Sequence, residues 1–270
     1  MPYATVASER IYYTYRKAPS PGAPHLILVH GAGGTHQHWG AAIRNLQGAN
    51  VYAPDLPGHG RSGGAGHDTT VDYAAFVAAF MDALGLPRAI VAGHSMGGAT
   101  AMTVALNYPQ RVAGLVLVGT GARLRVLPQI LEGTLNDFEN TVELICRYAY
   151  SPQAPRELVY RGQQQMAQVV PQTIHDDFVA CNTFDIMERL GEIRCPTLIL
   201  CGTEDALTPP KYASFLAERI AGADFKPVEG AGHMVMVEKA DEVAQAIASA
   251  LTKWGLQTTP GFSQNVGRGR

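Results

Sequence analysis

One serine in this chain has the surroundings of an activated nucleophile. It lies in the run Gly93-His94-Ser95-Met96-Gly97, which has the pattern G-x-S-x-G. Apolar residues 89–92 precede this run and small, helix-compatible residues 98–106 follow it, which predicts a strand, a sharp turn and a helix. Glycines suit such a turn because the two backbones must pass close to each other. The turn would hold the Ser95 hydroxyl above a sheet and place the Met96 N–H at a helix N-terminus, where it can bind an oxyanion.

A serine hydroxyl is a poor nucleophile at neutral pH, so Ser95 needs a base, and the base needs an orienting acid. His233 lies on a Gly-rich loop after the last predicted strand, and Asp205 directly follows the strand predicted over 197–201. Functional groups of open α/β sheets collect at the carboxyl ends of the strands. We therefore predict Ser95, Asp205 and His233 as the catalytic residues, in the chain order that this kind of serine turn uses.

Other carboxylates were weighed against Asp205. Glu204 is its immediate competitor, and either side chain could simply lie at the surface. The end of the strand predicted over 114–119 offers Thr120 and Gly121 but no carboxylate, so that alternative position for an acid is empty. The sequence therefore favours Asp205.

The other histidines have structural explanations. His30 and His59 are expected to brace their loops, and His94, within the serine turn, to point away from the serine hydroxyl. His36 and His38 resemble a pair of metal ligands, but no third ligand or helix supports such a site. The sequence therefore predicts neither a metal nor a cofactor.

The elements that must position these residues alternate between strands and helices. The predicted strands are an N-terminal hairpin around 6 and 11–15, then 26–29, 51–53, 89–92, 114–119, 197–201 and an edge strand, marked by Pro227, over 225–228. The predicted helices are 39–46, 70–84, 98–106, 211–220 and 240–254, and Thr70 and Gly85 are expected to cap the second of them. This alternation predicts an α/β fold with a mostly parallel central sheet flanked by helices.

A segment without buried-strand character interrupts this alternation between residues 122 and 190. Its apolar residues are punctuated by prolines and predict several helices. We therefore expect a core formed by residues 1–121 and 191–255, an inserted helical cap at 122–190 and a polar C-terminal tail at 256–270.

Composition narrows the class of protein. Of 270 residues, 46% are hydrophobic and 16% charged, which is typical of a globular chain, and the net charge of −2 gives no sign of a nucleic-acid partner. No segment has the length of a signal peptide core or a membrane span, so we expect a cytoplasmic protein without a membrane partner. The oligomeric state is not indicated. Buried free thiols without metal spacing are expected at Cys146, Cys181, Cys195 and Cys201.

Together these motifs resemble the α/β-hydrolase superfamily. The resemblance rests on His30-Gly31-Ala32-Gly33-Gly34, Asp55 to Ser62, the serine turn, Gly202-Thr203-Glu204-Asp205 and Gly232-His233, and it covers nearly all of the chain outside the insert and the tail. It implies a catalytic triad of Ser95, Asp205 and His233, with the N–H groups of Ala32 and Met96 as oxyanion-hole donors. It also implies that 122–190 is a cap over the site.

The resemblance leaves several functions open. We expect a serine hydrolase that cleaves a carboxylic ester of a small to medium, largely apolar substrate. The alternatives with the same triad are carbon–carbon bond hydrolysis, lactone hydrolysis and perhydrolysis of the haloperoxidase type, and a more remote one is a non-catalytic ligand receptor. Ser95 stands where haloalkane dehalogenases and epoxide hydrolases carry Asp, and Gly34 where many carbon–carbon hydrolases carry Pro. A nucleotide-binding oxidoreductase is not expected. The dinucleotide-binding pattern G-x-G-x-x-G is incomplete here, because its third glycine would fall at His36.

Overall fold

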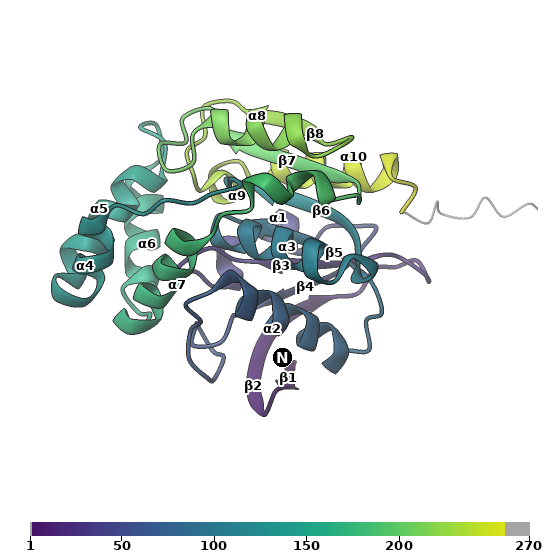
Figure 1. Cartoon of the computed structure of the whole chain (residues 1–270), viewed down its shortest axis with the longest axis horizontal. Coiled ribbons are helices and arrows are strands. Elements are labelled where there is room, and N and C mark those ends of the chain that lie inside the picture. Colours follow the sequence, from purple (N-terminus) through teal and green to yellow (C-terminus); the bar gives the residue numbers. More distant parts are fainter. Residues whose placement is uncertain (1, 257–270) are drawn as a thin grey trace, which may run out of the picture.

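Eight strands form one sheet in this computed structural model, which describes residues 2–256 (Figure 1). In chain order they are β1 Tyr3–Val6, β2 Glu9–Arg16, β3 His25–Val29, β4 Asn50–Pro54, β5 Ala89–His94, β6 Val112–Val118, β7 Thr197–Gly202 and β8 Asp224–Val228. Their order across the sheet is β1-β2-β4-β3-β5-β6-β7-β8. The pairs β1–β2 and β2–β4 are antiparallel, and all the others are parallel. The prediction of a mostly parallel sheet, with the strand that contains Pro227 at its edge, is confirmed.

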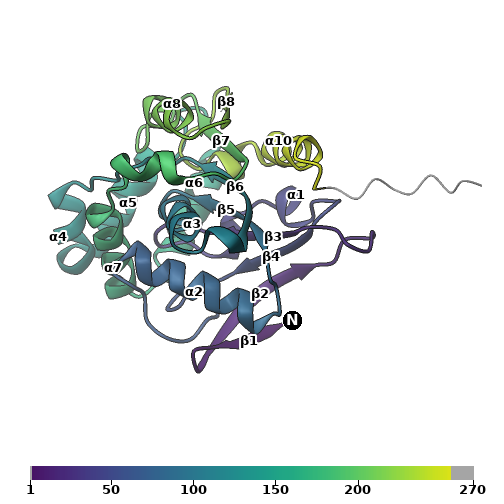
Figure 2. The same cartoon turned by 45° about the vertical axis from the view of Figure 1, so that its right-hand side comes forward.

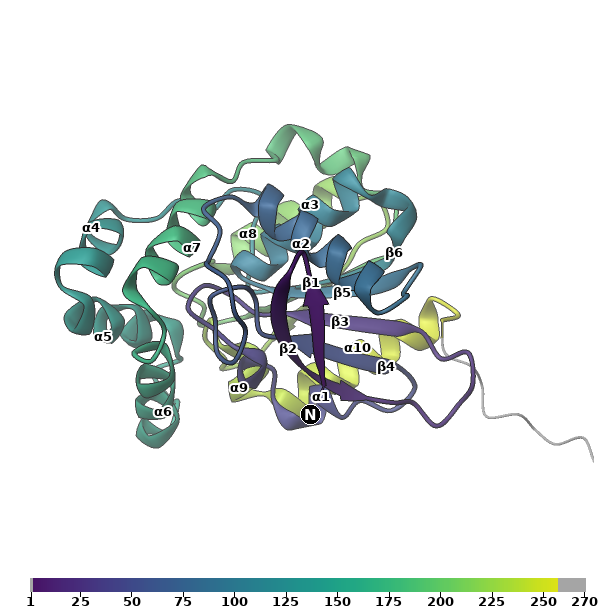
Figure 3. The same ribbon diagram turned by 90° about the horizontal axis from the view of Figure 1, so that it is seen from below.

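Side chains that alternate along each strand supply two separate cores. Ile27 and Val29 of β3 pack into one core, and Leu26 and Leu28 into the other. The first core contains residues of α2 Thr70–Ala83, α3 Met96–Asn107 and α8 Pro210–Arg219, and the second contains residues of α1 Ala41–Arg44, α9 Val235–Glu238 and α10 Ala240–Lys253. Figure 3 shows these two helix groups on opposite faces of the sheet. Coverage of both faces explains why the central strands are continuous apolar runs.

Four further helices form the predicted insert. They are α4 Pro128–Asn136, α5 Phe138–Ala149, α6 Arg156–Met166 and α7 Pro171–Thr183. They lie together beyond one end of the sheet, at the left of Figures 1 and 2. Val142, Ile145, Met166 and Ile174 belong to a small apolar core of their own. We call α4 to α7 the helical insert; its status as a separate cap domain stays a prediction.

Two helix predictions were wrong in detail. The helix expected over 39–46 is only the four-residue α1, because Trp39 and Gly40 have ψ of 110° and 154°, outside the helical region. Before them lies the 3₁₀ helix His36–His38, whose first N–H and ring are both held by the Asp55 carboxylate at 2.7 Å. Two other 3₁₀ turns are Pro109–Arg111 and Met187–Glu192. The N-cap of α2 is Thr69, whose hydroxyl accepts the Asp72 N–H, whereas Thr70 is buried inside the helix.

The remaining expectations concern the cysteines and the chain ends. Cys146, Cys181 and Cys201 are buried free thiols, but Cys195 is only half-buried. Apart from Leu256, the predicted polar tail lies outside the described residues. None of the helices within residues 2–256 combines the length and the apolar character that crossing a membrane requires.

Candidate active site

The serine turn joins β5 to α3 through a strained residue. Ser95 has φ +53° and ψ −117°, in the left-handed half of conformational space that a serine rarely adopts, and α3 begins at the next residue. A Cβ on Gly93 would overlap the carbonyl oxygen of Gly97, and a Cβ on Gly97 would overlap the carbonyl oxygen of Val29. Both glycines of the pattern are therefore required by the close passage of backbones.

Hydrogen bonds from the neighbouring strand fix this strained residue. The Ser95 N–H donates to the Val118 carbonyl at 3.0 Å, and the Thr120 hydroxyl donates to the Ser95 carbonyl at 2.8 Å. The end of β6, which has no carboxylate, thus holds the serine turn in place.

Asp205 and His233 are in direct contact. The ring Nδ1 of His233 lies 3.0 Å from Oδ2 and 3.2 Å from Oδ1 of Asp205. The carboxylate also accepts the N–H groups of Leu207 and Thr208, at 2.9 and 2.8 Å, and the Thr208 hydroxyl at 2.8 Å. Burial opposes ionisation, but His233 and the Thr208 donors outweigh it and lower the pKa of Asp205 below its ordinary value.

This carboxylate sets the tautomer of the histidine. An ionised Asp205 only accepts hydrogen bonds, so Nδ1 of His233 carries a proton, and in the neutral ring this leaves the lone pair on Nε2. The competing acid, Glu204, is exposed, whereas Asp205 is buried. The geometry therefore gives Asp205 and His233 the arrangement expected of an acid–base pair.

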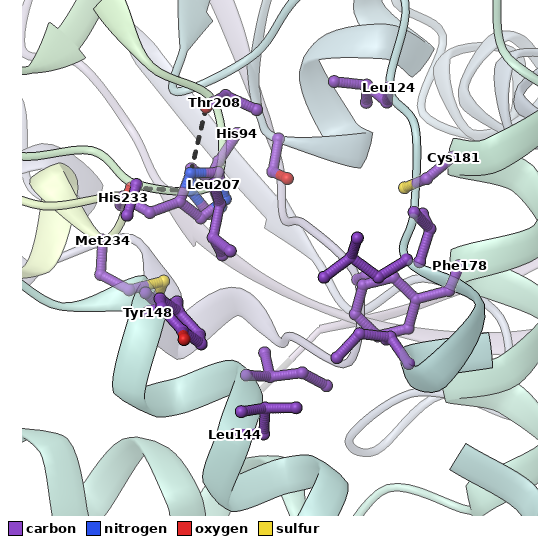
Figure 4. A pocket seen from close by; sticks show the side chains of 18 of the residues that line it. His94, Leu124, Leu144, Tyr148, Phe178, Cys181, Leu207, Thr208, His233 and Met234 are labelled. Atoms are coloured by element: carbon purple, nitrogen blue, oxygen red, sulfur yellow. Dashed lines mark hydrogen bonds between the residues drawn. The ribbon is translucent and has the colours of Figure 1, made fainter. Parts of the chain in front are cut away.

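A cavity of about 360 Å³ opens beside Ser95 and His233. In Figure 4, Leu144 and Tyr148 of α5 and Phe178 of α7 lie across this cavity from His233. Most of its other walls are apolar and come from the helical insert and the segment before it, including Leu124, Val126, Leu127, Ile130, Ile145 and Met166. The insert therefore shapes the space in which a substrate would meet the serine.

Within residues 2–256, Ser95 Oγ and the His233 ring border the same cavity without being hydrogen-bonded to each other. Such bonds are often long in a free enzyme and shorten when substrate binds. Of the three predicted catalytic residues, Asp205 and His233 are therefore in contact with each other, and Ser95 lies on the same cavity as His233.

The predicted oxyanion-hole donors are the backbone N–H groups of Ala32 and Met96. Ala32 borders the cavity on the loop after β3, and Met96 is the first residue of α3. Within the part of the chain that the structure describes, neither N–H donates a hydrogen bond to a protein acceptor. The loop that carries Ala32 is closed by a bond from the Gly34 N–H to the Gly31 carbonyl, at 3.1 Å.

The two histidines that resembled a metal pair have separate roles. Nδ1 of His36 lies 2.7 Å from the buried Asp55 carboxylate, whereas His38 borders the cavity. Residues 2–256 contain no group of three His, Cys, Asp or Glu side chains arranged as metal ligands would be.

Three buried histidines around the site are neutral. Nε2 of His30 accepts the Leu56 N–H at 3.0 Å, and Nε2 of His94 donates to the carbonyl of His233 at 3.1 Å. Burial is the largest cause that lowers the pKa of each, well below the ordinary value for His30 and His94 and to about 4 for His38. His94, expected to point away from the serine, packs its ring against His233 with 4.7 Å between ring centroids.

Two acids were missed by reasoning from the sequence, the buried Asp177 and the half-buried Glu238. Asp177 of α7 accepts the N–H of Gly33 at 2.7 Å, and Glu238 accepts the N–H groups of Gly232 and Ser151 at 3.0 and 3.1 Å. Each therefore ties a loop of the site to another part of the fold. One signal was present, since Asp177 is a charged residue in an apolar stripe at helical spacing, formed by Ile174, Phe178 and Cys181.

Comparison with known proteins places the chain in a family. The model of the family described as "alpha/beta hydrolase fold" matches residues 24–240. The chain belongs to this α/β-hydrolase family.

Relatives within the family differ in what their names say they act on. The chain is 29% identical to a 2-hydroxy-6-oxo-6-phenylhexa-2,4-dienoate hydrolase of Comamonas testosteroni over 239 residues, 80% of this chain and 84% of that one. It is 32% identical to a putative carbamate hydrolase, RutD, of Azorhizobium caulinodans over 246 residues, 86% and 91% of the two chains. A solved thermophilic esterase superposes with a TM-score of 0.82 at 32% identity, covering 94% of this chain and 97% of that one. These α/β hydrolases share a fold but not one named substrate.

We predict that Asp205→Asn lowers kcat on an activated ester by about 10⁴-fold, because an amide can stabilise the wrong tautomer of His233 and cannot balance its positive charge. Steady-state kinetics with an aryl ester measure this. The control is Glu204→Gln at the exposed neighbouring position, which should leave kcat within about twofold of the parent. Equal losses in the two variants would contradict the assignment of the acid to Asp205.

We also predict that the free energy of unfolding falls as the pH drops from about 6.5 towards 4, in part through His38. The folded protein holds the pKa of His38 at about 4 against an ordinary value of 6.5, so the unfolded chain takes up the proton first. The loss begins below 6.5 and levels off below 4. Between these two pH values, His38→Gln should reduce the slope of the free energy of unfolding against pH by up to about 1.4 kcal/mol per pH unit.

Denaturant unfolding at a series of pH values tests this prediction. The free energy of unfolding of each protein is expressed relative to its value at pH 8, where the imidazole of His38 is neutral in the folded and the unfolded states. Parallel curves for the parent and His38→Gln between these pH values would show that His38 does not contribute.

Proposed function

We propose that this α/β hydrolase is a serine esterase that cleaves carboxylic esters of small to medium, largely apolar molecules. The observation that carries the proposal is the Asp205–His233 pair on the same apolar-walled cavity as Ser95. A neutral His233 with a free lone pair on Nε2 is the base that a serine nucleophile needs.

The first half of the proposed reaction forms an acyl-enzyme. His233 Nε2 takes the hydroxyl proton of Ser95 while Oγ attacks the ester carbonyl carbon, and the carbonyl electron pair moves to oxygen. The N–H groups of Ala32 and Met96 stabilise this oxyanion. The oxyanion then collapses, the bond to the alcohol oxygen breaks, and His233 gives its proton to the leaving alcohol. Throughout, the carboxylate of Asp205 stabilises the positive charge on His233.

The second half releases the acid. A water molecule replaces the alcohol and attacks the acyl carbon while His233 Nε2 takes one of its protons. Collapse of the second oxyanion breaks the bond to Ser95 Oγ, which recovers its proton from His233. The net reaction consumes one water and yields an alcohol and a carboxylic acid.

The walls of the cavity favour uncharged substrates. Among the residues that line it, Arg125 is the one lysine or arginine. Its guanidinium donates to the Asn182 carbonyl at 2.8 Å, lies 3.9 Å from the Asp185 carboxylate and has 59% of its side chain exposed. The rest of the lining is mainly apolar, which suits a neutral acyl or alcohol group.

A carbon–carbon bond hydrolase is the second candidate. The Comamonas testosteroni relative is named for a dienoate, which is a carboxylate substrate. In this chain, Arg125 is the cation at the cavity that could receive a carboxylate. Lactone hydrolysis and perhydrolysis would use the same three residues as ester cleavage, and a ligand receptor would use the cavity without turnover.

We predict that Ser95→Ala lowers kcat on nitrophenyl esters by about a millionfold, as loss of the nucleophile does in serine hydrolases. A series from acetate to octanoate, run beside simple lactones, identifies the preferred acyl group. The matched control is Ser249→Ala on the exposed side of α10, which should retain the parent rate. Parent-like turnover by Ser95→Ala would refute the proposal, and an unlabelled Ser95 after exposure to a reactive phosphonate would favour a receptor.

Arg125→Gln separates the two candidates. For an esterase of neutral substrates we predict that kcat/KM on nitrophenyl esters stays within about threefold of the parent, because the guanidinium contacts no charged group of the substrate. If hydroxy-oxo-dienoates are the true substrates, the parent cleaves them faster than esters and Arg125→Gln loses at least about tenfold in kcat/KM, as expected for a lost charged hydrogen bond. The measurement is a comparison of kcat/KM for both substrate classes in both proteins.

A further inference from the structure

One buried carboxylate of the helical insert reaches the loop behind the cavity. Asp177 lies on α7 and is fully buried. Its Oδ2 accepts the N–H of Gly33 at 2.7 Å and Nε2–H of His59 at 2.8 Å, and its Oδ1 accepts the hydroxyl of Tyr73. The three donors come from the loop after β3, the loop after β4 and helix α2. Asp177 therefore joins the insert to three separate parts of the core.

The partners of Asp177 all donate hydrogen bonds to its carboxylate oxygens. Nδ1 of His59 lies 2.9 Å from the Pro57 carbonyl, so both ring nitrogens of His59 face acceptors and both must carry protons. Burial favours neutral His59, but Asp177 outweighs it and raises the pKa of His59 above its ordinary value. The Tyr73 hydroxyl accepts a hydrogen bond from the His67 N–H and donates one to Asp177. Asp177 thus accepts hydrogen bonds from the His59 ring and from two neutral donors.

The bond to Gly33 acts one peptide away from a proposed oxyanion-hole donor. The N–H of Gly33 belongs to the peptide group that follows Ala32, so fixing its direction also fixes ψ of Ala32. Gly33 has φ +60°, and a Cβ there would lie 3.2 Å from both Ile174 and Met166 of the insert. The turn bond between Gly34 and Gly31 closes the loop. Contacts from the insert therefore hold one side of the loop, while the Ala32 N–H has no protein acceptor among residues 2–256.

We propose that Asp177 is a positioning residue: through Gly33 it holds the Gly31–Gly34 loop in the shape that presents the Ala32 N–H to the substrate oxygen. The oxyanion hole is then complete only while α7 is docked on the core. This inference rests on the proposed serine-hydrolase function. It makes α7 part of the catalytic geometry as well as a wall of the cavity.

The expected effect is on turnover more than on substrate binding. Loss of one oxyanion-hole donor lowers kcat by about 10²- to 10³-fold in a serine hydrolase. A donor that is misaligned but still present should lower it by about tenfold to a hundredfold, since small errors of placement reduce transition-state stabilisation. KM should change by less than about threefold because the apolar walls that bind the ground state stay in place.

Three single variants test the proposal. Asp177→Asn keeps the shape of the side chain but removes its charge, so the bond to the Gly33 N–H is weakened. Tyr73→Phe removes a different donor to the same carboxylate without touching the loop. Asp176→Asn changes the neighbouring residue on α7, whose carboxylate accepts a bond from Gln172 at the surface. For each variant, kcat and KM on an aryl ester, the rate of Ser95 phosphonylation and the thermal midpoint are measured.

The proposal expects Asp177→Asn to lose about tenfold to a hundredfold in kcat and in phosphonylation rate, with KM nearly unchanged. Tyr73→Phe should lower the thermal midpoint but keep kcat within about threefold of the parent, and Asp176→Asn should change neither. A purely structural role for Asp177 predicts a lower midpoint with kcat of the folded fraction preserved. That outcome, or equal losses of kcat in Asp177→Asn and Tyr73→Phe, would overturn the proposal.

If Asp177→Asn does not fold, the double variant Asp177→Asn/His59→Gln tests the proposal instead. It removes His59 together with its carboxylate partner, so no unpaired charge is left buried. It should show the same loss of kcat, and a parent-like kcat in the folded double variant would overturn the proposal. Failure of the esterase proposal looks different: the parent itself would neither turn over esters nor react at Ser95. An active parent with an equally active Asp177→Asn would reject this inference alone.

Discussion

The start of α3 passes close beside the ends of β3 and β5, with no room for side chains between them. A side chain on Gly97 would occupy the space of the Val29 carbonyl, and a side chain on Gly93 would occupy that of the Gly97 carbonyl. This contact places Ser95 in a strained conformation between the first residues of α3 and the loop that carries Ala32. The strain is tolerated because the end of β6 fixes the residue through the bonds to Val118 and Thr120.

Much of this arrangement could be predicted because parallel strands bring their carboxyl ends to one edge of a sheet. The loops after β3, β5, β7 and the last strand, β8, carry Ala32, Ser95, Asp205 and His233, and the structure brings all four residues to that edge. The two helix layers could be predicted equally well, since uninterrupted apolar strands imply that helices cover both faces of the sheet. These features depend on local pattern and strand order, which the sequence carries directly.

Contacts between distant segments could not be predicted in the same way. Asp177 and Gly33 are 144 residues apart in the chain, and Ser151 and Glu238 are 87 apart. The helical spacing marks Asp177 as a polar residue in an apolar stripe, but its partners depend on how α7 docks. Short elements are hard to predict for a related reason: Asp55 holds the backbone N–H and the ring of His36 in a 3₁₀ turn just before the predicted helix. In each case the contact is made by a carboxylate from another segment of the chain.

The buried contact between Asp177 and His59 bears on the role of the helical insert. Two opposite charges removed from water gain little net stability over well-packed apolar residues, so Asp177 and His59 are poorly explained as a stabilising device. An apolar contact would also allow α7 to slide along the core, whereas hydrogen bonds to three defined donors fix its register. Such a contact is most useful where small displacements matter, and the loop beside Ala32 is such a place. The insert can then vary its cavity-facing side chains while one polar anchor preserves its alignment with the core.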